Sequence, residues 1–472
     1  MSKLPDKVSL LFLMCLTLVL GIWSPHQSFT ATPKYWWDES FAVETARTIL
    51  EQGRIDITVA PHTPSNKAII LSSNGFPLSV PLAGVYLLFG FGITQTRIYM
   101  LCWILATVAV LYWFLKNFFD KKSAFLGTLL VTTFASFYAN GRTATGDIPG
   151  FFFLLLGLFL CIKKENFVLG GIVLGLAAIT KTSLYHMIFP AITIVYIVAY
   201  GKKFILPTLK TAIGSITVAL VWGLLLLPHP YAFSDLAAGF EFYDNPINKP
   251  SLLDKLPVSL VQVFSSSTIL YFLAFLCLIL FAHKKYAFSR EQKMLITFAL
   301  AYIFFQFFVF LRSPGWHRYL LASELLILML LYPSLRFIGM LRTLHRLVPA
   351  GIIALLAFAQ TTHYLLFSNI FSNPSPTKIA DAINKILEKE TKSTVGFIND
   401  PITASQIDGR RKYQIVHVGG NTYAGKHPLE YKPAQLPTYM IQGDKEHKEV
   451  LDRYYRSVFL LEGLPIYKRI DL

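Results

Sequence analysis

The chain has 472 residues, of which 54% are hydrophobic and only 15% are charged, and its mean hydropathy is +0.50. A soluble domain would carry about a quarter charged residues, so the composition indicates a polytopic membrane protein. The net charge of +16 does not predict a nucleic-acid partner, because the basic residues follow a membrane topology. The four cysteines fall in apolar runs without metal-ligand spacing, so we expect neither a zinc site nor a disulfide framework.

Spans of about 20 apolar residues predict transmembrane helices. Eleven are predicted, at 8–24, 98–115, 123–139, 148–162, 167–181, 184–200, 204–227, 258–282, 293–311, 319–337 and 347–368. If the apolar stretch 76–93 does not span, one side of the membrane carries 17 basic and 4 acidic residues and the other carries 11 of each. This asymmetry is typical of a basic cytoplasmic side. We therefore predict that 76–93 is juxtamembrane or re-entrant, with the N-terminus cytoplasmic and the C-terminus outside.

The predicted fold class is an α-helical polytopic membrane protein with a small extracytoplasmic C-terminal α/β domain. The membrane domain is expected at 1–372, with a first extracytoplasmic loop at 25–97, and the soluble domain at 373–472. In the polar C-terminal region, periodicity predicts helices at 379–387 and 444–455 and strands at 394–398, 413–418, 438–442 and 457–461.

Two adjacent carboxylates, Asp38 and Glu39, follow the first predicted span. The residues after them have helical spacing, so both acids are expected near a helix N-terminus, where backbone N–H groups favour anions. A carboxylate at the membrane–water boundary can stay ionised and reach an acceptor hydroxyl or amine, as a catalytic base must. The alternative is that Asp38 only caps the helix.

A second polar segment contains Arg142 and Asp147. Asp147 precedes Pro149 and an apolar run, which is also the pattern of a helix N-cap. Arg142 is a candidate to bind a phosphate or to pair with Asp147. Lys181 separates two apolar runs on the side opposite the lysine clusters, and Lys67 is a further candidate cation in the first loop.

A short loop between two predicted spans contains Arg312, His317 and Arg318. The planar guanidinium group of arginine suits phosphate binding. The alternative is that these residues anchor the two helices, with the neighbouring aromatic residues in the interfacial belt. Glu324, within the next span, is an intramembrane acid whose role the sequence does not define.

All these candidates except Glu324 lie on the predicted outer face. Acids for proton transfer and cations for a phosphate are what a transferase with a phosphate leaving group requires. A non-catalytic transporter or flippase of polyprenyl lipids or ions is the alternative. That alternative predicts charges near the bilayer midplane, broken paired helices and an internal repeat, and the sequence shows none of these clearly.

The chain resembles the GT-C glycosyltransferases, in particular the dolichyl-phosphate-mannose protein mannosyltransferase and aminoarabinose (lipid A) transferase branch. Trp37 to Arg47 resembles the family's Asp-Glu first-loop motif, and Asn74 to Leu78 resembles its Gly-Lys-Pro-Pro-Leu segment. Three further segments resemble the Arg-x-x-x-x-Asp-Met-Pro, Gly-Leu-Ala-x-Leu-Thr-Lys-Gly and Arg-Tyr-x-Leu-Pro motifs, at 142–149, 175–182 and 317–320. The ordered resemblance covers about residues 8–340.

Two departures from the family pattern affect the expected site. Phe76 stands where the family has lysine, and Leu321 and Ala322 follow where the last motif ends in Leu-Pro. If the family lysine holds the lipid phosphate, Lys67, Lys181 or Arg142 must take its place. The region 373–472 has no match in the resemblance.

The resemblance implies transfer of a sugar from a polyprenyl (dolichyl or undecaprenyl) phosphate to an acceptor with inversion. Arg318, with Lys181 or Arg142, would hold the phosphate. Asp38 would be the base, and Asp147 would help to hold the acceptor or the base. Glu39 is the alternative base.

The implied enzyme is a hexosyl- or aminopentosyl-transferase of the cell envelope, in the inner or plasma membrane, with its active site outside. Its partners would be membrane lipids, the lipid-linked donor and a protein, lipid or glycan acceptor. We expect no cofactor and no metal, since a third clustered carboxylate is missing from the motifs.

Overall fold

The computed structural model describes residues 6–22, 29–31, 33–67, 75–228, 234, 237, 252–285, 287–312, 317–340, 347–367, 373–418, 421–442 and 447–470. Contacts between residues divide the chain into two compact units. Unit 1 comprises 1–29, 97–225 and 240–369, and unit 2 comprises 30–96, 226–239 and 370–472.

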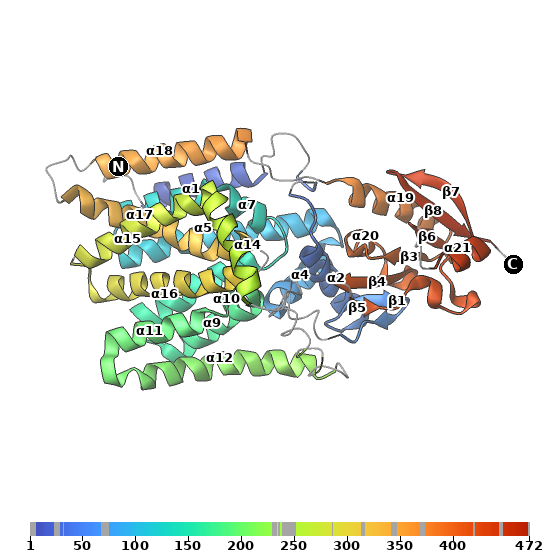
Figure 1. Cartoon of the computed structure of the whole chain (residues 1–472), viewed down its shortest axis with the longest axis horizontal. Helices are drawn as coiled ribbons and strands as arrows, with labels where there is room; N and C mark the ends of the chain where they lie inside the picture. Colours follow the sequence, from blue (N-terminus) through green and yellow to red (C-terminus); the bar gives the residue numbers. More distant parts are fainter. Residues whose placement is uncertain are drawn as a thin grey trace. The chain divides into compact units, whose positions relative to one another are not determined.

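Unit 1 is a bundle of apolar helices, whose long members run alongside one another in Figure 1. Its elements are α1 (Asp6–Ile22), α5 (Ile93–Phe118, which begins in unit 2), α6 (Lys121–Thr132), α7 (Ala135–Gly141), α8 (Asp147–Leu158), η1 (Phe159–Lys163), α9 (Phe167–Thr180), α10 (Thr182–Tyr185), α11 (Ile188–Tyr200), η2 (Gly201–Lys203), α12 (Ile205–Leu226, whose last residue falls in unit 2), α14 (Leu252–Ser265), α15 (Ser267–Lys285), α16 (Arg290–Arg312), η3 (His317–Leu320), α17 (Leu321–Met340), α18 (Val348–Thr362) and η4 (His363–Phe367). In the described part, seven helices are long and apolar enough to cross a membrane. The predicted helical membrane fold is confirmed, while the number of eleven spans stays a prediction.

The predicted spans 123–139 and 258–282 are each interrupted in the structure. The stretch 123–139 is divided between α6 and α7, where the hydroxyl of Tyr138 donates to the carbonyl of Thr132 at 2.6 Å. The stretch 258–282 is divided between α14 and α15 at Ser266, whose hydroxyl accepts from the backbone N–H of Ile269 at 3.3 Å. Local hydrogen bonds therefore satisfy backbone groups at both breaks, and apolar composition alone does not reveal either break.

The charges predicted to share the basic side of the membrane pair with one another in unit 1. Each of the four acids assigned to that side has a basic partner, in the pairs Asp6–Lys116, Asp6–Lys121, Asp120–Arg336, Glu165–Arg290 and Glu291–Lys163. The side-chain amide of Gln292 also donates to the carbonyl of Phe118, which joins the end of α5 to the start of α16. These contacts bring together the loops that the topology argument placed on one side.

Unit 2 contains a six-stranded mixed sheet in the order β5-β4-β3-β6-β8-β7, with β3 parallel to both of its neighbours. Its elements are α2 (Trp37–Gln52), β1 (Thr58–Ala60), β2 (Thr63–Pro64), α4 (Phe76–Phe89), α19 (Ser375–Lys389), β3 (Val395–Ile398), α20 (Pro401–Ala404), η5 (Gly409–Arg411), β4 (Lys412–Val418), β5 (Asn421–Gly425), η6 (Pro428–Glu430), η7 (Pro433–Gln435), β6 (Tyr439–Ile441), α21 (Lys448–Tyr454), β7 (Tyr455–Leu461) and β8 (Leu464–Arg469). The six elements predicted at 379–461 are confirmed as α19, β3, β4, β6, α21 and β7. Strands β5 and β8 were missed.

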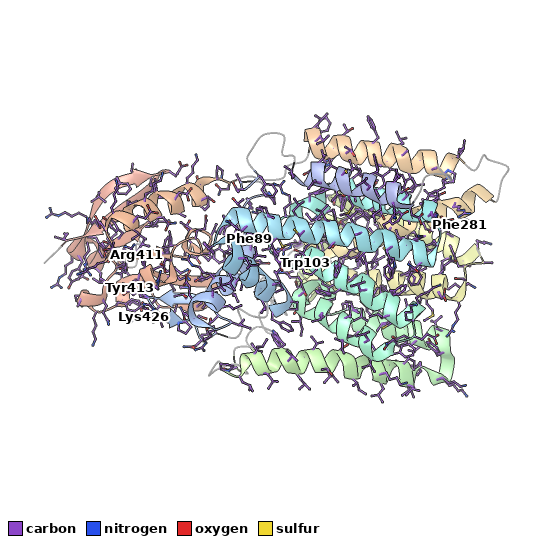
Figure 2. The ribbon with its side chains drawn as sticks, turned by 180° about the vertical axis from the view of Figure 1, so that it is seen from behind. Phe89, Trp103, Phe281, Arg411, Tyr413 and Lys426 are labelled. Carbon is purple, nitrogen blue, oxygen red and sulfur yellow. The ribbon has the colours of Figure 1, made fainter. Side chains whose placement is uncertain are left out.

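Two clusters of buried side chains stabilise the sheet of unit 2. Ile379, Ile383 and Leu387 of α19 pack against Val395 and Phe397 of β3. Arg411, labelled in Figure 2, donates to the backbone carbonyls of Leu387 and Ser393, so it ties the end of α19 to the start of β3. The predicted α/β character of the C-terminal region is therefore confirmed.

The first loop packs with the C-terminal region in unit 2. Phe41 of α2 lies in one buried cluster with Ile57, Val59, Val416 and Ala424. This contact-based division differs from the predicted boundary at 372, which assigned the loop to the membrane domain. The division into a catalytic domain at 1–372 and a soluble domain at 373–472 stays a prediction.

Helix α4 corresponds to the stretch 76–93 that we predicted not to span. It has 14 residues, about 21 Å of helix, against a hydrocarbon core of about 30 Å. Its N-cap is Gly75, and Pro77 lies in its first turn, where a missing N–H is tolerated. The short length supports the juxtamembrane interpretation.

Candidate functional site

Asp147 and Arg318 form an ion pair in unit 1. The Nη2 atom of Arg318 lies 2.9 Å from Oδ2 of Asp147, and its Nε lies 3.2 and 3.3 Å from the two carboxylate oxygens. The side chain of Asp147 is fully buried, whereas that of Arg318 is 25% exposed. The carboxylate thus fixes one edge of the guanidinium group, while part of the Arg318 side chain is exposed.

The surrounding residues hold the Asp147 carboxylate in place. The hydroxyl of Thr145 donates to its Oδ2, and the hydroxyl of Tyr185 donates to its backbone carbonyl. Asp147 is the first residue of α8, and the N-cap is Gly146. The alternative interpretation of Asp147 as an N-cap is therefore wrong. Gly146 occupies that position, and the Asp147 side chain forms an ion pair with Arg318.

Gly146 brings the Asp147 segment against Lys181. It has a φ of +83°, and a Cβ atom at this position would clash with the carbonyl oxygen of Thr180 and lie 3.4 Å from Cβ of Lys181. Lys181 itself separates α9 from α10 with an extended backbone, and it is 4% exposed. Residues that the sequence separates by more than thirty positions are thus neighbours in the structure.

Arg142 is buried and contacts other residues of unit 1. Its Nη2 donates to the carbonyl of Phe29 at 2.9 Å, and its guanidinium lies 5.0 Å from the centre of the Phe29 ring. Its backbone carbonyl accepts from Nη1 of Arg97 at 2.5 Å, and Arg97 is fully buried as well. Sequence reasoning missed Arg97; the available signal was an arginine at the very start of a predicted span.

The remaining candidate cations have less support. His317 is exposed in η3 and has a ring contact with Phe310 at 6.0 Å. Arg312 ends α16, and its side chain lies outside the described residues. Lys67 belongs to unit 2, where its backbone N–H donates to the hydroxyl of Ser65.

The two adjacent acids of the first loop lie in the first turn of α2, in unit 2. The N-cap is Trp36, so Asp38 does not occupy the capping position, and the alternative that it only caps this helix is not what the structure shows. Glu39 is fully buried, whereas Asp38 is partly exposed. Of the two, Asp38 is the more accessible carboxylate.

A buried polar cluster that sequence reasoning missed anchors α2. Nζ of Lys412 lies 2.6 Å from Oε1 of Glu44, and both side chains are at most 2% exposed. The same carboxylate accepts from the side-chain amide of Gln414 and from the backbone N–H of Thr58. Burial lowers the pKa of Lys412, and the facing Glu44 carboxylate opposes that shift. No local signal could reveal a pair whose partners are separated by most of the chain.

A family model described as dolichyl-phosphate-mannose-protein mannosyltransferase matches residues 79–229. No curated protein gives a match. Among solved structures, ArnT from Cupriavidus metallidurans bound to undecaprenyl phosphate is 12% identical, with 98% of each chain covered and a TM-score of 0.66.

Two structures of the Archaeoglobus fulgidus oligosaccharyltransferase are also similar. The complex with Zn and sulfate is 13% identical and covers 98% of this chain and 73% of its own, with a TM-score of 0.61. The AglB complex with an inhibitory peptide and a dolichol-phosphate is 12% identical and covers 95% and 69%, with a TM-score of 0.53. The chain has the GT-C fold. The resemblance predicted from the five motifs is confirmed, since the family model over residues 79–229 and the fold both agree with it.

A metal site is not assembled by the residues that the structure describes. Within them, no group of three or more His, Cys, Asp or Glu side chains is positioned to hold an ion. The zinc of the archaeal complex therefore has no matching set of ligands in this part of the chain, and we derive no step through a metal. Independence from metal stays a prediction.

Proposed function

We propose that the protein is an integral-membrane glycosyltransferase that moves a sugar from a polyprenyl phosphate to an extracytoplasmic acceptor with inversion. The observation that carries the proposal is the Asp147–Arg318 pair, in which a buried carboxylate orients the guanidinium group of a partly exposed arginine side chain. The fold supports it, because ArnT with this fold is bound to undecaprenyl phosphate and AglB is bound to a dolichol-phosphate.

Arg318 is proposed to bind the lipid phosphate and to stabilise its charge as the bond to the sugar breaks. A guanidinium group fits phosphate oxygens with two parallel hydrogen bonds, and preorganised donors act most strongly where water is excluded. Lys181 is proposed as the second cation. Arg142 is better explained as a structural residue, because its guanidinium already donates to the carbonyl of Phe29.

Asp38 is proposed as the base, and its partial exposure favours it over the fully buried Glu39. The acceptor oxygen or nitrogen would attack the anomeric carbon while the bond from that carbon to the phosphate oxygen breaks. The acceptor proton would go to Asp38, and the phosphate would leave with the bonding electron pair. A sugar transferred in one such displacement is inverted at the anomeric carbon.

The test compares cells that carry wild-type protein, no protein, Asp38→Asn or Glu39→Gln. Mass spectrometry of envelope lipids, glycans and proteins should show a sugar that is lost without the protein and lost with Asp38→Asn. Glu39→Gln is the matched control, and the amount of each variant in the membrane is measured in parallel. Full modification by Asp38→Asn would refute the role of this base.

The same experiment separates the enzyme from the alternative transporter or flippase. A transporter predicts unchanged glycans and a polyprenyl lipid that accumulates on one side of the membrane. The proposed orientation, with a cytoplasmic N-terminus, is tested by labelling single cysteines introduced at exposed positions of unit 2 with a membrane-impermeant reagent. Labelling only after the membrane is opened would contradict this orientation.

A further inference from the structure

A cavity of about 290 Å³ lies within unit 1, between α15, α16 and α17. Each helix lines it with residues at positions i, i+3, i+4 and i+7, so each presents one continuous face to the cavity. The faces of α15 and α16 consist of leucine, isoleucine and phenylalanine side chains. The volume is near the lower end of the range for small-molecule sites, about 300 to 1,000 Å³.

The face contributed by η3 and α17 carries the polar groups of the cavity. Ser323 and Glu324 line it between Leu320 and Ile327. The two polar residues are 3% and 6% exposed, respectively. Among the described residues, the hydroxyl of Ser323 has no hydrogen-bond partner, and no hydrogen bond or ion pair joins the Glu324 carboxyl to another side chain or to the backbone.

Burying two polar groups in an apolar cavity costs free energy when neither has a partner among the described residues. Burying a hydroxyl without a hydrogen bond is unfavourable, and burying an isolated carboxylate ion costs far more free energy than burying the neutral acid. The neutral acid offers one O–H donor, and serine offers another. The cavity is therefore complementary to a molecule that is mostly apolar and carries hydrogen-bond acceptors at one end.

The edge of the cavity is open to the surface of the bundle. Phe304, Leu273 and Leu280 line it and are 58%, 37% and 46% exposed. On helices that are long and apolar enough to cross a membrane, such a surface faces lipid chains. A ligand would thus enter sideways from the bilayer.

We propose that this cavity binds an uncharged acyl lipid, with its chain among the leucine and phenylalanine side chains and its ester carbonyl or hydroxyl at Glu324 and Ser323. A polyprenyl chain is a poorer occupant because it has no acceptor for the two donors. A phosphate headgroup does not fit either, because the described residues that line the cavity include no lysine or arginine. The site is distinct in chemistry from the one proposed at Arg318.

The test uses purified full-length protein and monocaprin, a short monoacylglycerol, with decane and squalene as comparators that lack acceptors. Native mass spectrometry measures the affinity for each. Wild-type protein should bind monocaprin most tightly, and Glu324→Leu should weaken that binding by about threefold to tenfold, the range expected for one lost hydrogen bond. Glu324→Gln should keep most of the affinity, because the amide still donates.

Two further variants make the outcome decisive. Leu276→Trp should abolish binding of all three probes by filling the cavity, and Ser323→Ala should have a smaller effect than Glu324→Leu. Folding is checked in each variant by its thermal unfolding midpoint. Equal binding of squalene and monocaprin, unaffected by Glu324→Leu, would overturn the proposal in favour of a polyprenyl-chain site. Binding of none of the probes to folded wild-type protein would overturn it as well.

Discussion

Two buried ion pairs, one in each unit, differ in what they leave accessible. In unit 2, both members of the Glu44–Lys412 pair are enclosed, and the carboxylate also accepts from Gln414 and Thr58. In unit 1, the carboxylate of Asp147 is enclosed, but the side chain of Arg318 is 25% exposed. The first pair uses its charges to join distant segments, whereas in the second the arginine side chain is partly exposed.

This difference separates a structural role from a binding role. An enclosed pair contributes little net free energy compared with apolar residues of the same size, but removal of one partner leaves a costly buried charge. A partly exposed guanidinium that is fixed along one edge is preorganised for an anion. We therefore expect substitutions in the Glu44–Lys412 pair to affect folding and substitutions of Arg318 to affect binding and transfer.

The largest effect is expected from Lys412→Met. It leaves the Glu44 carboxylate buried without its cation and should destabilise unit 2 by about 3 to 5 kcal/mol. Hydrogen exchange of peptides from α2 and β4 measures this loss. Exchange unchanged from wild type would contradict a structural role for Lys412.

Arg318→Ala should lower transfer by about a hundredfold to a thousandfold, the range for loss of one preorganised donor to a developing charge. The assay is loss of the envelope sugar defined with Asp38→Asn. Arg318→Lys is the matched control, and it should keep part of the activity because it keeps the charge but loses the planar group. Wild-type transfer by Arg318→Ala would contradict the binding role.

The double substitution Glu44→Leu with Lys412→Met tests whether the unpaired Glu44 charge causes the loss of stability. It removes both charges, so it should recover about 2 kcal/mol of the stability lost in Lys412→Met. Recovery is incomplete because Gln414 and the N–H of Thr58 lose their acceptor. Hydrogen exchange again provides the measurement, and a double variant less stable than Lys412→Met would show that the pair is not the source of the effect.

The smallest expected effect is a change in how the stability of unit 2 depends on pH in the acidic range. Hydrogen bonds from Ser393 and Lys468 lower the pKa of Glu390 to about 2. Because an unfolded glutamate has a pKa of about 4.3, this group stabilises the folded state above that pH, and the contribution is lost as the pH falls toward 2. Glu390→Gln should flatten the loss of stability between about pH 5 and pH 2, and Glu388→Gln on the same helix is the control. An unchanged pH profile in Glu390→Gln would refute this linkage.

Much of the fold could be predicted from local patterns. Apolar runs predicted the membrane helices, and alternation predicted β3, β4 and β6. The breaks at Thr132 and Ser266 could not be predicted, because hydrogen bonds from single side chains decide them. Strands β5 and β8 were missed, since each is defined by its pairing with neighbouring strands in the sheet.

The sequence predicted those residues of the candidate site that are charged and lie next to apolar runs. Asp147, Lys181 and Arg318 were found in this way, and the structure brings Arg318 to Asp147 and the Asp147 segment to Lys181. Glu44 and Lys412 were missed because each looks like an ordinary charge in a polar segment. Only the packing of the first loop with the C-terminal sheet explains them.

The central claim is that Arg318, held by Asp147, binds a lipid phosphate. Native mass spectrometry of the purified chain with undecaprenyl phosphate and with undecaprenol tests it most directly, in wild type and in Arg318→Gln. We predict that wild type binds the phosphate form at least about tenfold more tightly and that Arg318→Gln removes this preference. Equal binding of the two lipids by wild type, or an undiminished preference in Arg318→Gln, would contradict the claim.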